Sequence, residues 1–232
     1  MNLSHYNLLA ELFWYPDLAY ADRVKPVHEF LLKNHPDAAA EMNAFVELFP
    51  FGALREMEEL FTRSFDVQSI TTLDVGYVLF GEDYKRGELL ANLNREHNES
   101  GVDCKNELAD HLPNLLRLIA VLGEVPDKAE LVEELVVEIL APGLSQMIAE
   151  FDPERLEEKD QCYLEHYKTL IETPGEYFTA YCHCLKAVQL VLSNDFSLEE
   201  KAAERPPMLE QSLDFLRSLR QEMEIEDHDH PE

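Results

Sequence analysis

The chain of 232 residues is 46% hydrophobic and 9% aromatic, a composition typical of a globular protein with a buried core. Its 19 basic and 47 acidic residues give a net charge of −28. That charge argues against nucleic acids and anionic membranes as partners, because both are bound through clustered lysines and arginines. It suits a basic peptide partner, although acidity by itself also keeps a protein soluble.

The start of the chain and its cysteines bear on the compartment. Met1–Tyr6 have no basic region ahead of an apolar run, so no signal peptide is expected. No stretch approaches the roughly 20 apolar residues that span a bilayer. We therefore expect a cytoplasmic protein without stable membrane insertion. Its four cysteines should be reduced thiols, at Cys104, Cys162, Cys182 and Cys184.

Apolar residues at three- and four-residue steps predict a series of helices in the first 65 residues. Prolines or polar stops separate them. The expected ranges are 3–14, 20–33, 37–49 and 52–65.

A short, unusually aromatic helix is predicted next, capped by Thr72 or Asp74 and ended by Gly81. Tyr77 and Phe80 are three residues apart and therefore share a face of it. Two interpretations of this pair stay open. The rings belong to the core, as aromatic rings commonly do, or they line a groove that receives an apolar peptide.

The segment Glu107–Pro113 joins a polar cluster to a strongly apolar helix. Asp110 is a good N-cap, which places Pro113 in the first turn, where its missing amide hydrogen costs nothing. The competing interpretation is a binding site, because Glu107, Asp110 and His111 form a dense polar set beside an apolar face. The spacing alone does not choose between a cap and a binding site.

The remaining elements are also predicted to be helical. Gly123–Pro126 is a turn and a candidate hinge, through which helix exchange would give a weak homodimer instead of a monomer. The pair Pro142-Gly143 should kink the helix that contains it. The helices are expected at 85–98, after Pro113, and at 127–150, 154–172 and 176–193.

The fold class is therefore all-α, a single bundle of about ten helices. We expect the helical domain over residues 1–195 and a helical appendage over 196–221. Residues 222–232 hold mostly acids and histidines, which predicts a disordered tail.

The motif Glu107-x-x-Asp110-His111-Leu112-Pro113, followed by a leucine-rich helix, resembles the signature of the NarJ/TorD/DmsD family. These proteins are dedicated assembly chaperones of molybdenum-cofactor oxidoreductases. The upstream pairs Leu79-Phe80 and Arg86-Gly87 resemble the nitrate-reductase, NarJ-like branch. The likeness covers roughly residues 1–190 in element order and length. Many members carry a proline shortly before the Asp-His pair, where this chain has Leu108-Ala109.

The resemblance implies a function and a site. A chaperone of this family would bind the N-terminal or twin-arginine leader segment of an apo catalytic subunit and hold it for cofactor insertion. Acidic and imidazole groups would meet the basic and backbone groups of that segment, while aromatic rings receive its apolar side chains. The implied client-binding residues are Glu107, Asp110, His111, Pro113, Tyr77, Phe80 and Arg86.

The motifs of enzymes and metal sites are scarce. The sequence holds no GxSxG, P-loop or GxGxxG pattern. Successive residues of Cys182-His183-Cys184 point about 100° apart on a helix, and Cys162 with His166 supplies only two ligands. His228 and His230 of the tail are expected to bind metal only adventitiously. We therefore expect no enzyme, metal or cofactor. The alternative is a helical metal-binding protein or enzyme that uses these cysteines and histidines, which metal analysis would distinguish.

Overall fold

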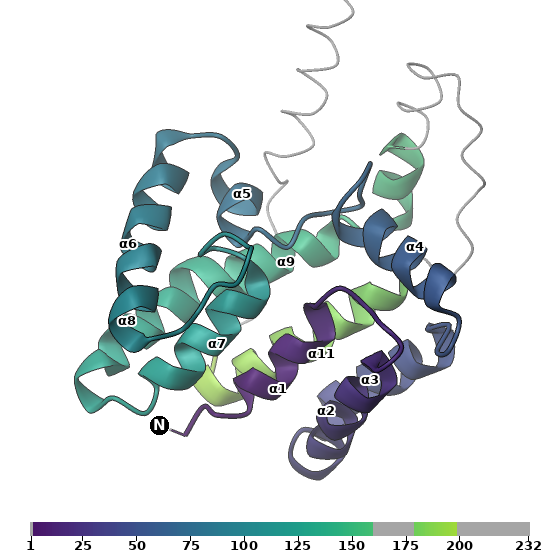
Figure 1. Ribbon diagram of the computed structural model, residues 1–232, viewed down its shortest axis with the longest axis horizontal. Coiled ribbons are helices and arrows are strands. Elements are labelled where there is room, and N and C mark those ends of the chain that lie inside the picture. Colours follow the sequence, from purple (N-terminus) through teal and green to yellow (C-terminus); the bar gives the residue numbers. More distant parts are fainter. Residues whose placement is uncertain (1, 160–178, 199–232) are drawn as a thin grey trace, which may run out of the picture.

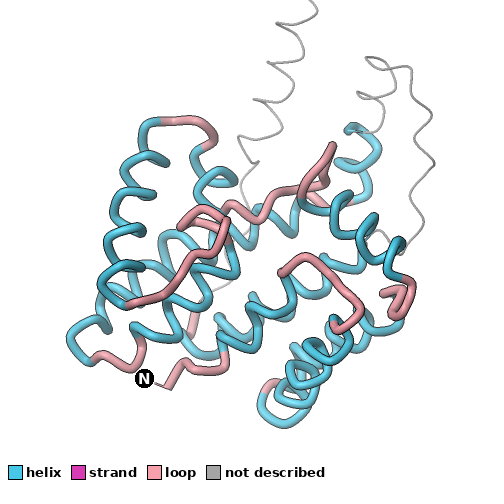
Figure 2. Tube along the Cα trace, viewed as in Figure 1, coloured by secondary structure: helices cyan, strands magenta, loops and turns pink. Residues whose placement is uncertain are grey.

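Helices form the regular structure of the chain (Figure 2). The computed structural model describes residues 2–159 and 179–198, where Asp74 and His111 form an isolated β-bridge but no strand is present. The predicted all-α bundle of about ten helices is confirmed for this part of the chain. The elements are α1 (Tyr6–Ala10), 3-10 helix η1 (Glu11–Phe13), α2 (Tyr20–Asn34), α3 (Pro36–Leu48), α4 (Leu54–Phe65), α5 (Val75–Phe80), α6 (Tyr84–Ser100), α7 (Leu112–Leu122), 3-10 helix η2 (Pro126–Lys128), α8 (Ala129–Glu134), π-helix η3 (Leu135–Leu140), α9 (Ala141–Ala149) and α11 (Ala180–Phe196).

Helix α11 lies in the middle of the bundle, between helices from the first and the second half of the chain (Figure 1). It packs against α3 from the first part of the chain and against α9 from the second, and α1 packs against α7. The buried face of α11 includes Tyr181, Val188 and Leu192. One continuous apolar core therefore extends from Leu3 to Leu192, as expected for a single bundle.

An aromatic cluster holds α11 against α3 and α4. The ring of Tyr181 lies 5.0 to 5.7 Å, centroid to centroid, from the rings of four phenylalanines. Tilted and edge-on arrangements at this separation are the favoured geometries of aromatic pairs. The cluster therefore fixes how the C-terminal helix docks. Its phenylalanines are Phe45, Phe49, Phe61 and Phe65.

The kink expected at Pro142 takes the form of a π-helical segment. Pro142 is in the first turn of α9, directly after η3. A proline inside a helix cannot donate to the preceding turn and its ring crowds that turn, so a wider turn relieves both problems. Gly143 permits close packing here, because a Cβ atom at this position would lie 2.5 Å from Cγ1 of Val75 in α5.

Several predictions concern the second half of the chain. Residues 153–159 are helical, but the rest of the helix expected at 154–172 lies outside the described residues. The start of the helix expected at 176–193 and the tail over 222–232 also lie outside them, as does the appendage beyond residue 198. The domain boundaries and the hinge at Gly123–Pro126 stay predictions. Within the described ranges, no helix combines the length and the apolarity needed to cross a membrane.

Candidate functional site

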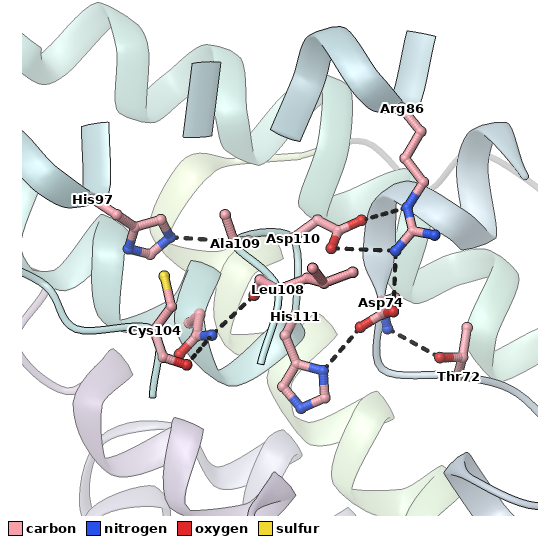
Figure 3. A network of polar contacts seen from close by, with 10 residues as sticks. Thr72, Asp74, Arg86, His97, Cys104, Leu108, Ala109, Asp110 and His111 are labelled. Carbon is pink, nitrogen blue, oxygen red and sulfur yellow. Dashed lines mark hydrogen bonds and ion pairs between the residues drawn. The ribbon is translucent and has the colours of Figure 1, made fainter. Parts of the chain in front are cut away.

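The segment between α6 and α7 is held by side chains from both helices. Asn114 of α7 is buried, and its side-chain amide donates to the carbonyls of Cys104 and Leu108, each at 3.0 Å (Figure 3). His97 of α6 is also buried and donates from Nε2 to the carbonyl of Ala109 at 3.2 Å. Burial lowers the pKa of His97, so this ring is neutral at neutral pH. These contacts fix the backbone immediately before the Asp-His pair.

Asp110 is fully buried, and its carboxylate is bound by Arg86 of α6. Nε of Arg86 donates to Oδ2 at 2.9 Å, and Nη2 lies 3.5 Å from Oδ1. The same Nη2 donates to Oδ2 of Asp74 at 3.0 Å. The guanidinium carbon is 5.1 Å from the centroid of the Tyr77 ring. One cation thus bridges two carboxylates (Figure 3). It also rests on an aromatic ring of α5.

Asp74 and His111 join the beginning of α5 to the beginning of α7. Nδ1 of the His111 ring lies 3.0 Å from Oδ1 of Asp74. The two residues also pair through their backbones as the isolated bridge. The ladder consists of two hydrogen bonds of 3.0 and 2.8 Å, from the N–H of Val75 to the carbonyl of Asp110 and from the N–H of Leu112 to the carbonyl of Leu73. We call Asp74, Arg86, Asp110 and His111 the ion-pair corner.

The two carboxylates of the ion-pair corner respond differently to their surroundings. Burial would raise the pKa of Asp74, but its hydrogen bonds and attraction to His111 and Arg86 hold that pKa below its ordinary value. Burial and the nearby charge of Asp74 raise the pKa of Asp110, although Arg86 opposes the shift. Asp110 is therefore the carboxylate that depends most on Arg86 to stay ionised.

The predicted N-cap role of Asp110 is wrong. Helix α7 begins at Leu112, and His111 occupies the N-cap position without a side-chain capping bond. The Asp110 carboxylate points instead to Arg86, a stronger charged partner than a backbone amide. Pro113 lies in the first turn of α7, as expected, and is buried. In this state Asp110 has no exposed surface, so pairing with an arginine of another polypeptide would require release of Arg86.

The other predicted site residues differ in burial, and all of them except Arg86 are outside the ion-pair corner. Glu107 is exposed. Tyr77 and Phe80 of α5 are half-buried and do not belong to the core cluster. Arg86 is half-buried within the ion pairs described above. Of the segments that carry the three sequence similarities, Leu79-Phe80 ends α5 directly before α6, and Arg86 of α6 is bound to Asp110 in the segment Glu107–Pro113.

Comparison with known proteins leaves the site to be interpreted from its own chemistry. No family model matches the chain, and no curated protein matches it. An Asp-His pair acts in catalysis when the ring also faces a nucleophile or metal. Across residues 2–159 and 179–198, the hydrogen bonds of the His111 ring include none to a serine, threonine or cysteine side chain.

The cysteines of α11 fit poorly with the alternative of a cysteine-based metal or catalytic site. Cys182 and Cys184 are both buried in the core. Burial raises the pKa of Cys182 to about 11 and that of Cys184 well above its ordinary value. Buried thiols of this kind stay protonated, whereas cysteine nucleophiles are thiolates. His183 faces Glu41, 2.6 Å away, instead of the two thiols. Cys162 and His166 lie outside the described residues.

Sequence reasoning missed three contributors to the corner. Asp74 was expected only as a helix cap, yet its side chain makes no capping bond and binds Arg86 and His111. The ring of Trp14, the single tryptophan, lies 6.2 Å from that of His111, with Nζ of Lys105 3.7 Å from the Trp14 centroid. Asp74 lies 12 residues before Arg86, and this short spacing was a usable signal that the two could pair. No feature of the sequence connects Trp14 with the ion-pair corner.

Asp74 makes acid stability depend on the ion-pair corner. Because its pKa is lowered on folding from an ordinary value of 3.8, its contribution is present above that value and is lost as the pH falls through the folded-state pKa. We expect Asp74→Asn to cost about 1–2 kcal/mol at neutral pH, since it loses charged hydrogen bonds. The difference from the parent should shrink below about pH 4 in urea titrations. The exposed Asp66→Asn is the control, and an Asp74→Asn deficit that grows with acidification would contradict this assignment.

Proposed function

We propose that the chain is an assembly chaperone for a molybdenum-cofactor oxidoreductase. It binds the N-terminal segment of the apo catalytic subunit and holds it while the cofactor is inserted. The observation that supports this proposal best is the Arg86–Asp110 ion pair, which links two of the three family-like segments.

The corner divides into a buried support and an outer contact surface. Asp110 and Arg86 serve as positioning residues, because their charges satisfy one another in the interior. The client contacts are assigned to His111, Glu107, Tyr77 and Phe80. Two apolar side chains beside them are strongly exposed, with Leu108 48% and Tyr84 77% accessible. Exposed apolar and aromatic groups next to acids match a client segment with alternating apolar and basic side chains.

The charge of the chain supports a basic client. A net charge of −28 repels acidic partners and attracts a segment rich in arginine or lysine, which raises the encounter rate at low salt. A chaperone that only holds its client requires no bond-making step, so we propose no enzymatic activity. A cytoplasmic location fits the proposal, because cofactor insertion would precede attachment or export of the client.

Peptide binding to the full chain tests the proposal. The probe is a synthetic peptide with the N-terminal sequence of the molybdoenzyme catalytic subunit encoded in the same genome, with a scrambled peptide as control. Trp14 beside His111 provides an intrinsic fluorescence signal for occupancy of the corner. We expect saturable 1:1 binding by fluorescence and calorimetry, with binding to the scrambled peptide at least about tenfold weaker.

Variants locate the binding surface. We expect His111→Ala and Phe80→Ala each to weaken peptide binding about tenfold or more, as removal of central interface contacts does. Glu107→Gln should lower the association rate, with the difference disappearing at high salt. The matched controls are His28→Ala and Glu59→Gln, a histidine and an exposed glutamate on other helices. Unchanged peptide affinity in folded His111→Ala and Phe80→Ala would contradict the assignment of the binding site. Absence of any peptide binding to the parent would contradict the proposed function.

A further inference from the structure

Three helix ends from distant parts of the sequence place metal-ligating side chains together. His5 is at the start of α1, His35 lies between α2 and α3, and Asp195 is in the last turn of α11. One ligand atom from each side chain lies within 4.8 Å of the other two. No sequence pattern predicts a metal site here, because the three residues share no motif and are up to 190 positions apart.

The backbones that carry the two histidines are fixed by helix hydrogen bonds. The carbonyl of His5 accepts from the N–H of Leu9 at 3.1 Å. The N–H of His35 donates to Leu31 at 2.8 Å, and its carbonyl accepts from Ala39 at 2.9 Å. Asp195 belongs to a helix anchored in the core. The positions of the three side chains are therefore set by rigid elements, which favours a preformed site.

Neighbouring groups orient the ligands. Nε2 of His5 lies 2.7 Å from Oδ2 of Asp195, and the buried Tyr6 hydroxyl donates to the same oxygen at 3.0 Å. The ring of Phe30 stacks on His5, with 5.2 Å between centroids, and lies 5.5 Å from the ring of His35. A hydrogen bond to the carboxylate and an aromatic wall behind the imidazoles are the kind of outer contacts that orient metal ligands.

We propose that His5, His35 and Asp195 form a binding site for a divalent first-row transition metal ion, with zinc as the reference ion. Ligand atoms around a tetrahedral zinc with bonds of about 2.1 Å lie about 3.4 Å apart. The atoms of this site already lie within 4.8 Å of one another, so small side-chain rotations would bring them to this spacing. The ion would take the place of the hydrogen bond between His5 and Asp195, and a His5 ring that ligates through Nε2 would carry its proton on Nδ1.

The ligand set selects the class of metal. Two imidazoles disfavour magnesium and calcium, which prefer oxygen ligands, and favour zinc, cobalt, nickel and iron. Three protein ligands leave a coordination position for water. All three ligand side chains are half-buried, so an ion can enter from solvent without unfolding the core. The bound ion would join α1, the α2–α3 corner and the end of α11.

Metal binding to the full chain tests this site. All proteins carry His228→Ala and His230→Ala, because the acidic tail also offers imidazoles. Zinc is titrated against a chromophoric chelator, cobalt is followed by its visible absorption, and melting temperature is recorded with and without zinc. The variants are His35→Gln and Asp195→Asn, which keep a polar side chain of similar size. The control is His28→Gln, a half-buried histidine that pairs with Asn43.

We expect one zinc per chain, a cobalt spectrum without a sulfur charge-transfer band, and a melting temperature that rises with zinc. His35→Gln and Asp195→Asn should each weaken zinc binding about tenfold or more and abolish the thermal shift, while His28→Gln behaves like the parent. Affinity equal to the parent in both ligand variants would overturn the proposal. So would a sulfur–cobalt band, an equal loss in His28→Gln, or no stoichiometric binding.

Discussion

Replacing Arg86 with methionine should lower the free energy of unfolding by about 3 kcal/mol, because it leaves the Asp110 carboxylate buried without its cation. Methionine keeps most of the aliphatic stem, so the loss reports on the charge and its hydrogen bonds. Urea unfolding at neutral pH measures the effect. Arg95→Met on the same helix is the control, since that side chain is 60% exposed and its Nε lies as far as 3.9 Å from the Glu96 carboxylate. It should change stability by no more than about 0.5 kcal/mol.

The pH dependence of Arg86→Met provides a second signature. Asp110 already has a raised pKa, and loss of Arg86 removes the main attraction that opposes burial. A carboxyl whose pKa is raised on folding binds more protons in the folded state, so stability falls as pH rises through that interval. The deficit of the variant should therefore shrink on mild acidification. Adding Asp110→Asn should restore much of the stability at neutral pH, and a pH-independent deficit would contradict the ion-pair account.

Replacing Gly76 with alanine should cost about 1–3 kcal/mol, although the position is helical and alanine is the better helix former. A Cβ atom there would lie 2.6 Å from Oδ2 of Asp110 and 3.0 Å from Cδ2 of Leu89. The carboxylate cannot retreat without weakening its bond to Arg86. The methyl group therefore presses on the ion-pair corner itself.

Gly87 offers a matched comparison for this effect. It is exposed within α6, and a Cβ atom there would meet nothing within 4 Å. Gly87→Ala should therefore stabilise the protein by about 0.5–1 kcal/mol through helix propensity alone. Thermal unfolding of both variants separates the two contributions. Equal stabilisation by the two alanines would mean that α5 does not approach Asp110 as closely as described.

Helix positions were largely predictable because they depend on local patterns. The apolar spacing from Val24 to Leu31 indicated α2, and Gly81 and Gly101 end α5 and α6 at positive φ. Proline gave a less definite signal. Pro26 lies inside α2 without ending it, and Pro142 produced a π-helix whose type the sequence did not indicate. Such outcomes depend on tertiary packing around the ring.

The candidate site was only partly predictable. The resemblance singled out Arg86, Asp110 and His111. It did not predict that Arg86 binds Asp110 of the same chain, 24 residues away. That pairing follows from the packing of α6 against α7, which no local pattern records. Trp14 and Asp195 show the same limit, because their neighbours come from distant parts of the chain. Residue spacing predicts which side chains share a face of one helix, but it does not predict tertiary contacts between helices.

The central place of α11 has a consequence for biosynthesis. Synthesis proceeds from the N-terminus, so α1 to α4 leave the ribosome long before Tyr181 and the rest of α11 exist. Until then Phe45, Phe61 and Phe65 lack the ring that they pack around in the finished protein. The nascent chain is therefore expected to expose the apolar surface of these phenylalanines during translation. A protein whose proposed task is to shield another unfinished polypeptide thus depends on early protection of its own.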